Sequence, residues 1–302
     1  MNLALAAAGT SVRAAAAFSP RWGAAVAMPL FGHVAKPRPV HSDDEATLLR
    51  ARLHAVRIAG IDRRGVDVDT YEWGDGPRTV VLSHGWNGRA SQFSVLVREL
   101  LADGYRVVAF DAPAHGDSPG RSTYLIDWID ALAAVQRRHG RLRAVVGHSF
   151  GGLAALVAAC DGLPVERVVT VASPADAGLL LTQFQRMLGY GDPVAAALRD
   201  RFARRYFPGV ADPFPRLSPI ERPVPAGTAL LAVHDETDRV VPYGELGRIA
   251  GAHRDARLVT THGFGHNRIL ESDPFLDAVI DFVGAPVPSS VTPPIAQPAV
   301  LA

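Results

Sequence analysis

The chain of 302 residues contains a single cysteine, Cys160, so it cannot form a disulfide within itself. It has no large excess of charge of either sign, with 31 basic and 30 acidic residues, and its overall charge gives no reason to expect general attraction to nucleic acid or to anionic membranes. No apolar run reaches the roughly 20 residues of a membrane span. The apolar stretch at residues 3–8 precedes the first basic residue, Arg13, which reverses the order in a secretory signal. We therefore expect a soluble cytoplasmic protein, and we leave open membrane-surface association of the Ala-rich N-terminus.

Metal and cofactor motifs are also missing. The 11 histidines show no H-E-x-x-H or other ligand spacing, and a lone cysteine makes no thiolate cluster. Neither a P-loop nor a G-x-G-x-x-G motif follows the first buried strand. The sequence therefore predicts that the protein uses neither a metal ion nor a cofactor.

Hydrophobic patterns predict alternating strands and helices from residue 79 onward. Continuous apolar runs are typical of strands buried on both faces, whereas the segments between them have helical periodicity. The expected strands are 79–82, 106–110, 143–146, 167–171, 229–233 and 256–260, and the expected helices are 91–102, 122–139, the segment after Ser149, and one ending near Phe282. A hairpin at 52–58 and 66–73 precedes them. This order predicts an α/β fold with a doubly wound, mostly parallel sheet, whose ligands bind at the carboxyl ends of the strands.

The predicted domain organisation has three parts. Residues 1–41 form an Ala- and Pro-rich N-terminal extension that is either partly helical or disordered. Residues 42–283 form the α/β domain, beginning with a short helix from Ser42. Within this domain the alternation stops at about 174–225, which we interpret as a helical cap inserted over the edge of the sheet. Residues 284–302 are rich in Pro, Ser and Ala and are expected to be a disordered tail.

The strongest local signal is Gly147-His148-Ser149-Phe150-Gly151, which fits G-x-S-x-G between a predicted strand and a predicted helix. The turn in such a motif is so tight that Cβ atoms at the flanking glycine positions would clash. Its central hydroxyl is exposed near the free N–H groups of a helix N-terminus. Ser149 is therefore the candidate nucleophile.

A serine hydroxyl needs an adjacent base, and the base needs an acid to orient it. Two stretches downstream of Ser149 follow predicted strands and carry suitable side chains. One runs from His234 to Pro242 and offers Asp235, Glu236 and Asp238 as acids; the other ends in Gly263-Phe-Gly-His266, with His262 as a second histidine nearby.

Five stretches in this order resemble the α/β-hydrolase family, in its branch of serine hydrolases with a variable cap. They are Ser83-His-Gly-Trp-Asn-Gly88, Asp111-Ala-Pro-Ala-His-Gly-Asp-Ser118, Gly147-His-Ser-Phe-Gly151, Asp238-Arg-Val-Val-Pro242 and Gly263-Phe-Gly-His266. The resemblance covers about residues 66–283 and implies that Ser149 is the nucleophile, His266 the base and Asp238 the acid, the last because it fits the family pattern D-x-x-V-P.

The resemblance also implies an oxyanion hole made by the backbone N–H groups of Phe150 and Trp86, because Trp86 follows His84-Gly85. The ring of Trp86 is expected to wall the acyl pocket and to disfavour bulky acyl groups. His84, His115 and His148 are expected to stabilise loops without a catalytic role.

The function implied by the resemblance is that of a cofactor-free serine hydrolase of the carboxylesterase type, acting on a small-molecule ester of short to medium acyl chain. Thioester or amide hydrolysis and acyl transfer would use the same residues. A hypothesis of another class is a non-catalytic ligand receptor built on a hydrolase fold. The sequence does not indicate an oligomeric state.

Overall fold

The computed structural model describes residues 3–34, 36–61 and 63–286. Most of the predicted tail, from residue 287 onward, lies outside the described residues. Residues 285 and 286 lie against the sheet, because Arg167 at the start of its sixth strand donates to the backbone carbonyls of Ala285 and Pro286, each at 2.8 Å.

In the described part of the chain, eight strands form one sheet in the order β1-β2-β4-β3-β5-β6-β7-β8. They are β1 (Arg52–Ile58), β2 (Val66–Trp73), β3 (Thr79–Ser83), β4 (Arg106–Phe110), β5 (Ala144–His148), β6 (Arg167–Val171), β7 (Ala229–Asp235) and β8 (Arg257–Thr261). The pairs β1–β2 and β2–β4 are antiparallel and all the others are parallel. The predicted doubly wound, mostly parallel sheet is confirmed.

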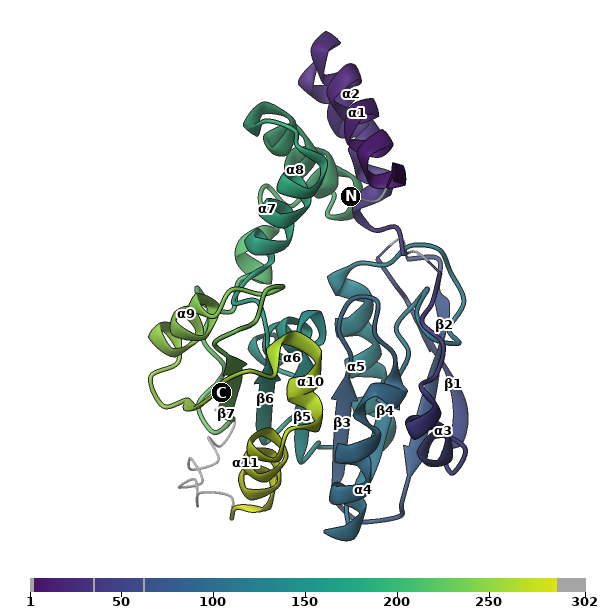
Figure 1. Ribbon diagram of the computed structural model, residues 1–302, viewed down its shortest axis with the longest axis vertical. Coiled ribbons are helices and arrows are strands. Elements are labelled where there is room, and N and C mark those ends of the chain that lie inside the picture. The colour runs from purple at the N-terminus through teal and green to yellow at the C-terminus, as the bar shows by residue number, and fades with distance from the viewer. Residues whose placement is uncertain (1–2, 35, 62, 287–302) are drawn as a thin grey trace, which may run out of the picture.

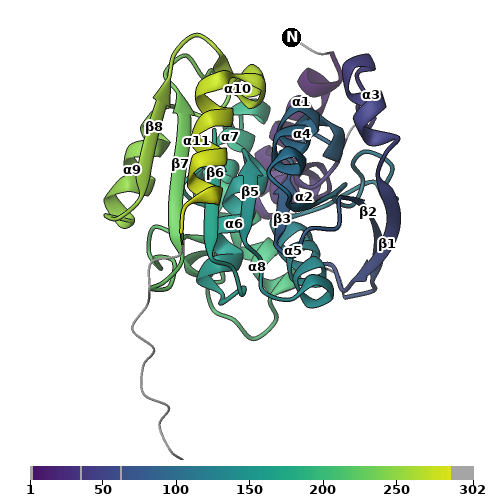
Figure 2. The ribbon, with the colours of Figure 1, turned by 90° about the horizontal axis from the view of Figure 1, so that it is seen from below.

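Helices cover both faces of this sheet (Figure 2), which explains why its central strands are continuous apolar runs. One face is covered by α5 (Leu125–His139), α6 (Phe150–Cys160) and α9 (Gly244–Ala252), and the other by α4 (Ser94–Ala102) and α11 (Asp273–Gly284). Shorter elements are α3 (Ser42–Leu48), α10 (Gly265–Arg268) and the 3₁₀ turns η1 (Ala90–Phe93) and η3 (Ile269–Glu271).

The segment expected to form a cap lies between β6 and β7 and contains α7 (Ala177–Leu188), α8 (Asp192–Tyr206) and the 3₁₀ turn η2 (Phe214–Leu217). The N-terminal residues form two helices, α1 (Leu3–Phe18) and α2 (Pro20–Phe31), which pack on α7 and α8. These four helices stand together at one end of the molecule, above the sheet (Figure 1). A separate hydrophobic cluster joins them, in which the ring of Phe31 contacts those of Phe184 at 5.1 Å and Phe202 at 5.9 Å.

Several elements differ from the sequence-based expectation, among them two helices and one strand. The helix predicted at 122–139 begins only at Leu125, because the carboxylate of Asp127 accepts hydrogen bonds from the Thr123 hydroxyl and the Tyr124 N–H and so caps the helix there. The strand predicted at 143–146 continues to His148. Helix α9 was not predicted; its three glycines lower helix propensity and hide the periodicity.

Candidate active site

Ser149 lies at the junction of β5 and α6 in a strained backbone conformation with a positive φ of 53° and a ψ of −119°. A Cβ atom added to Gly147 would lie 2.4 Å from the carbonyl oxygen of Gly151, and one added to Gly151 would lie 2.1 Å from that of Ser83. Both distances are far below a tolerable contact, so this turn admits only glycine at these two positions. Ser149 is held in the turn by its own N–H, which donates to the carbonyl of Val171 at 2.8 Å.

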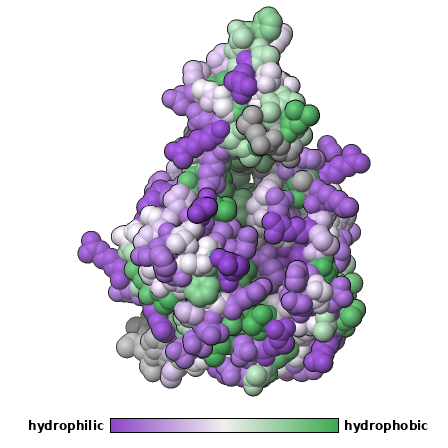
Figure 3. Space-filling view, in the orientation of Figure 1, coloured by the Kyte–Doolittle hydropathy of each residue, from purple (hydrophilic) through white to green (hydrophobic). Residues whose placement is uncertain are grey.

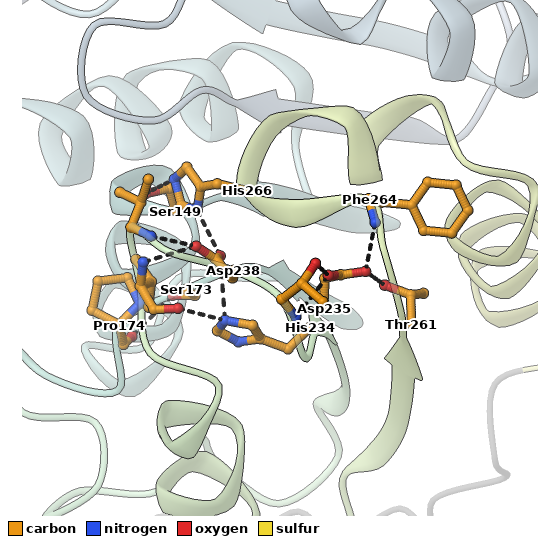
Figure 4. Close-up of polar contacts among 12 residues, drawn as sticks. Ser149, Ser173, Pro174, His234, Asp235, Asp238, Thr261, Phe264 and His266 are labelled. Atoms are coloured by element: carbon orange, nitrogen blue, oxygen red, sulfur yellow. Dashed lines mark hydrogen bonds and ion pairs between the residues drawn. The ribbon is translucent and has the colours of Figure 1, made fainter.

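The side chains of Ser149, His266 and Asp238 form a continuous hydrogen-bonded chain (Figure 4). The Nε2 atom of His266 lies 3.1 Å from Oγ of Ser149, and its Nδ1 atom lies 2.7 Å from Oδ2 of Asp238. A carboxylate only accepts hydrogen bonds, so a neutral His266 carries its proton on Nδ1. Its Nε2 is then the acceptor for the hydroxyl proton of Ser149. The three residues lie at the junction of β5 and α6, in the loop after β7 and at the start of α10.

Asp238 is buried and its carboxylate is fully satisfied. Oδ1 accepts hydrogen bonds from the N–H groups of Val240 at 2.7 Å and Val241 at 3.0 Å, and Nε2 of His234 lies 3.4 Å from Oδ2. Burial alone would raise the pKa of Asp238, but the interactions with His234 and His266 outweigh it and hold the pKa well below the usual range. This side chain is therefore an anion at neutral pH.

The other acidic candidates of the same loop point elsewhere. Asp235 accepts hydrogen bonds from Thr261 Oγ1 at 2.8 Å and from the N–H of Phe264 at 3.1 Å, and so connects the loop after β7 to the loop after β8 (Figure 4). Glu236 is exposed and lies 3.2 Å from Nδ1 of His262, which is exposed as well. The structure therefore brings only Asp238 and His266, of these candidates, to Ser149.

The loop after β3 passes directly against Ser149, since a Cβ atom on Gly85 would lie 2.9 Å from that of Ser149. The loop turns back through a hydrogen bond from Gly88 N–H to the Gly85 carbonyl. The ring of Trp86 is half-buried and packs edge-on against Phe150 at 5.4 Å between ring centroids. The N–H of Phe150 belongs to the first residue of α6, where a backbone amide has no partner within its helix.

Three buried imidazoles support these loops. His84 Nδ1 donates to the Gly85 carbonyl while its Nε2 accepts from Ala112 N–H, and His115 Nε2 accepts from Asn87 N–H. Burial lowers the pKa of His84 to about 4 and those of His115 and His148 to about 3, so all three are neutral at pH 7.

The alpha/beta hydrolase family model matches residues 80–281, which span every element of this site. The chain belongs to the alpha/beta hydrolase family. This confirms the family indicated by the five sequence stretches.

Curated relatives match over shorter regions of this alpha/beta hydrolase. A serine hydrolase-like protein of Dictyostelium discoideum is 30% identical over 113 residues, which are 35% of this chain and 32% of the relative. The bifunctional esterase/perhydrolase of Acinetobacter calcoaceticus is 35% identical over 120 residues, 36% of this chain and 42% of the relative. The chain thus spans less than half of the length of each of these relatives. Among solved structures, the esterase of Pyrococcus furiosus is similar in fold, with a TM-score of 0.57 and 21% identity over 83% of this chain and 97% of that one.

Within the described ranges of this alpha/beta hydrolase, no cluster of three or more His, Cys, Asp or Glu side chains could hold a metal ion. None of the helices in those ranges is both long and apolar enough to cross a bilayer. Cys160 donates to the carbonyl of Arg222, and burial raises the pKa of its thiol to about 11, so it remains a protonated thiol at neutral pH.

Two neighbours of the site were not identified from the sequence. Gln92 lies in η1, and its Nε2 atom is 3.1 Å from Nδ1 of His148. The Nε2 atom of His234 lies 3.4 Å from Oδ2 of Asp238 and 3.1 Å from the carbonyl oxygen of Val241. The position of His234, at the carboxyl end of a predicted buried strand, is a sequence signal that could have identified it as a neighbour of the site. Nothing in the sequence near Gln92 indicates its partner, which is 56 positions away.

Proposed function

We propose that this protein is a serine hydrolase that cleaves carboxylic esters of short to medium acyl chain through an acyl-enzyme on Ser149. The observation that carries the proposal is the pair of distances around His266, 3.1 Å to the Ser149 hydroxyl and 2.7 Å to the Asp238 carboxylate. Both are within hydrogen-bond reach, which is the geometric requirement for a base that activates a nucleophile.

In this mechanism the hydroxyl oxygen of Ser149 attacks the ester carbonyl carbon while Nε2 of His266 takes the hydroxyl proton. The anionic Asp238 stabilises the imidazolium that results. The tetrahedral intermediate then collapses, the C–O bond to the alcohol breaks, and the imidazolium gives its proton to the leaving alcohol. Water attacks the acyl-enzyme by the same route and releases the carboxylic acid.

The oxyanion of the tetrahedral intermediate is proposed to accept hydrogen bonds from the N–H groups of Phe150 and Trp86. Two observations support this assignment: Phe150 is the first residue of α6, and the backbone at Gly85 approaches Ser149 so closely that a side chain there would clash. Each such donor is worth about 3 kcal/mol of transition-state stabilisation.

The ring of Trp86 is proposed to limit the acyl pocket. It is held edge-on by Phe150 and stacks on Trp128 with an angle of 18° between the ring planes, so its position is fixed by packing. A fixed ring beside the reacting carbonyl leaves less space for long acyl chains. We expect Trp86→Ala to shift the preference among p-nitrophenyl esters toward longer chains, and a wild-type enzyme that already prefers long chains would contradict this role.

The experiment that tests the proposed function is labelling with a fluorophosphonate probe, followed by an ester panel. Wild-type protein should be labelled and should hydrolyse p-nitrophenyl acetate and butyrate, and Ser149→Ala should lose both properties. His262→Ala is the matched control, because this exposed histidine lies beside the same loop but not at Ser149. Protein that folds but stays unlabelled would favour a non-catalytic receptor.

Hydrolysis and acyl transfer share the acyl-enzyme and differ only in the acceptor. One relative is named a bifunctional esterase/perhydrolase, so a second acceptor is a relevant alternative. Product analysis in the presence of an added alcohol separates the two: free acid supports hydrolysis, whereas a new ester as the main product supports acyl transfer.

A further inference from the structure

The helices α1 and α2 form a hairpin that stands at the end of the molecule farthest from the sheet (Figure 1). Its inner side is closely packed on the cap. Val12 and Ala27 are fully buried, and a Cβ atom on Gly23 would lie 3.1 Å from Val194 of α8. The hairpin is therefore a fixed part of the cap, and its outer side chains have a defined position.

The outer side of this hairpin is apolar and exposed. Phe18 is 81% exposed, Trp22 64%, Leu3 86% and Val26 38%. The rings of Phe18 and Trp22 lie 6.0 Å apart at the corner between the two helices. Trp22, Val26 and the exposed Pro29 follow one another at helical spacing, so they form one stripe along α2. Single exposed apolar residues are ordinary, but a stripe ending in two aromatic rings at a protruding corner is typical of an interaction surface.

The charge around the hairpin is strongly asymmetric, although the whole chain carries a formal charge of only +1. Residues 1–42 contain no acidic residue and four basic ones. The adjoining cap helices α7 and α8 contain five arginines and two aspartates. The four helices α1, α2, α7 and α8 together contain seven arginines and two aspartates, a formal charge of +5, and the rest of the chain carries −4 on the same count. Within the described residues, no acidic side chain lies in ion-pair distance of the exposed Arg21, Arg186 or Arg201.

We propose that the outer face of the α1–α2 hairpin docks on an anionic lipid bilayer. In this arrangement Phe18 and Trp22 enter the boundary between headgroups and acyl chains, where aromatic rings are favoured, and arginines such as Arg21 face the anionic headgroups. The basic end is attracted to the bilayer surface and the acidic remainder faces away from it. The nearly balanced total charge conceals this attraction, which is why the composition alone did not indicate it.

A bilayer fits this surface better than a second copy of the chain does. A two-fold symmetric contact through the same face would bring two basic ends together, and like charges across an interface oppose association. Nucleic acid would complement the charge, but its phosphates offer nothing to the aliphatic side chains of Leu3 and Val26. The combination of exposed apolar groups with basic charge matches a lipid surface.

The test is co-sedimentation of the full chain with vesicles of phosphatidylcholine alone and of phosphatidylcholine with roughly a quarter phosphatidylglycerol. We expect binding to the anionic vesicles that weakens as salt is raised, together with a blue shift of tryptophan emission. The double variant Phe18→Ser, Trp22→Ser should bind at least about 10-fold more weakly. Leu49→Ser, Leu53→Ser is the matched control, because it removes two exposed apolar side chains, one just after α3 and one in β1, and should bind like wild type.

Failure of wild-type protein to bind anionic vesicles would overturn the proposal, as would equal binding by the Phe18→Ser, Trp22→Ser variant. Light scattering, which measures the oligomeric state, tests whether a second copy of the chain binds this face instead. A wild-type dimer that becomes a monomer in the Phe18→Ser, Trp22→Ser variant would show that it does, and would overturn the proposal. Retention on DNA without binding to vesicles would also overturn it. None of these outcomes depends on whether Ser149 is catalytic.

Discussion

The imidazole of His148 donates from Nε2 to the backbone carbonyl of His266, with 2.9 Å between the two atoms. Its tautomer is fixed from the other side, because the amide of Gln92 donates to Nδ1 at 3.1 Å. His148 thus connects the turn that carries Ser149 to the loop that carries His266. A residue within the elbow therefore positions the base through its main chain.

We expect Gln92→Leu to lower kcat by roughly 10- to 100-fold with little change in KM. Without the donor at Nδ1, His148 can adopt the other tautomer and lose its bond to the His266 carbonyl, and misplacing a reacting group by about 1 Å has an effect of this size. Steady-state kinetics on a soluble ester would measure it, with His262→Gln as a control that should leave kcat unchanged. A Gln92→Leu enzyme with wild-type kcat would rule out this positioning role.

Exchanging each aspartate of the loop after β7 for asparagine should give two different phenotypes. Asp238→Asn removes the acceptor that orients His266 and should reduce kcat/KM by roughly 10³- to 10⁴-fold, with a small change in stability. Asp235→Asn leaves the hydrogen bonds among Ser149, His266 and Asp238 intact. It replaces a carboxylate oxygen, which accepts from Thr261 and Phe264, by an amide NH₂ group that cannot accept. It should lower the free energy of unfolding by about 1–3 kcal/mol.

Ester kinetics and thermal unfolding of both variants would test this distinction. Equal losses of activity in the two variants would mean that Asp238 has no special role as the acid. A loss of activity confined to Asp235→Asn would transfer that role to Asp235.

The sheet could be predicted because its central strands are continuous apolar runs, which are recognisable in the sequence without knowing which segments they pair with. The apolar residues of β3, for example, are all buried, so burial on both faces alone explains their pattern. The positions brought together at Ser149 were predictable for a related reason: the carboxyl ends of parallel strands meet at one edge of a sheet.

Contacts between distant segments could not be predicted. The sequence analysis left residues 1–41 as either partly helical or disordered. Whether an Ala-rich segment forms stable helices depends on the surface that it packs on, and here Phe31 packs on Phe184 and Phe202. The choice between Asp235 and Asp238 likewise depended on a family pattern, whereas the structural distinction is the pairing of Asp235 with Thr261, 26 positions away.

Gly151→Ala should be among the most damaging small substitutions in this chain. Its new Cβ would lie 2.1 Å from the Ser83 carbonyl oxygen and 2.5 Å from that of His84, and backbone atoms at the end of a buried strand cannot move away. We expect a loss of about 3 kcal/mol or more in the free energy of unfolding, or insoluble protein.

Gly247→Ala is the matched control for this substitution. Gly247 is exposed within α9 and a Cβ there meets nothing within 4 Å, so alanine should raise the free energy of unfolding by about 0.5–1 kcal/mol. Thermal unfolding compares the two variants. Similar changes in both would show that the close approach of Gly151 to β3 does not constrain the turn.

The stability of the fold should decrease as the pH falls from about 6.5 toward about 4. Burial lowers the pKa of His84 to about 4 and those of His115 and His148 to about 3, whereas the same side chains take up protons near pH 6.5 in the unfolded chain. In this window the unfolded state binds more protons, so each histidine lowers the free energy of unfolding by on the order of 1 kcal/mol per pH unit.

Asp127 opposes this trend, because burial raises its pKa to about 6 and the folded state then binds a proton that the unfolded state does not. The loss of stability per pH unit should therefore be smaller than the three buried histidines alone would give. Urea denaturation at about pH 7, 6 and 5 would measure it. His115→Gln should reduce the slope of the free energy of unfolding against pH by an amount that corresponds to about one proton. His262→Gln should leave this slope unchanged, since that side chain is exposed. A free energy of unfolding that stays constant between pH 7 and 5 would mean that these imidazoles already bind protons in the folded protein.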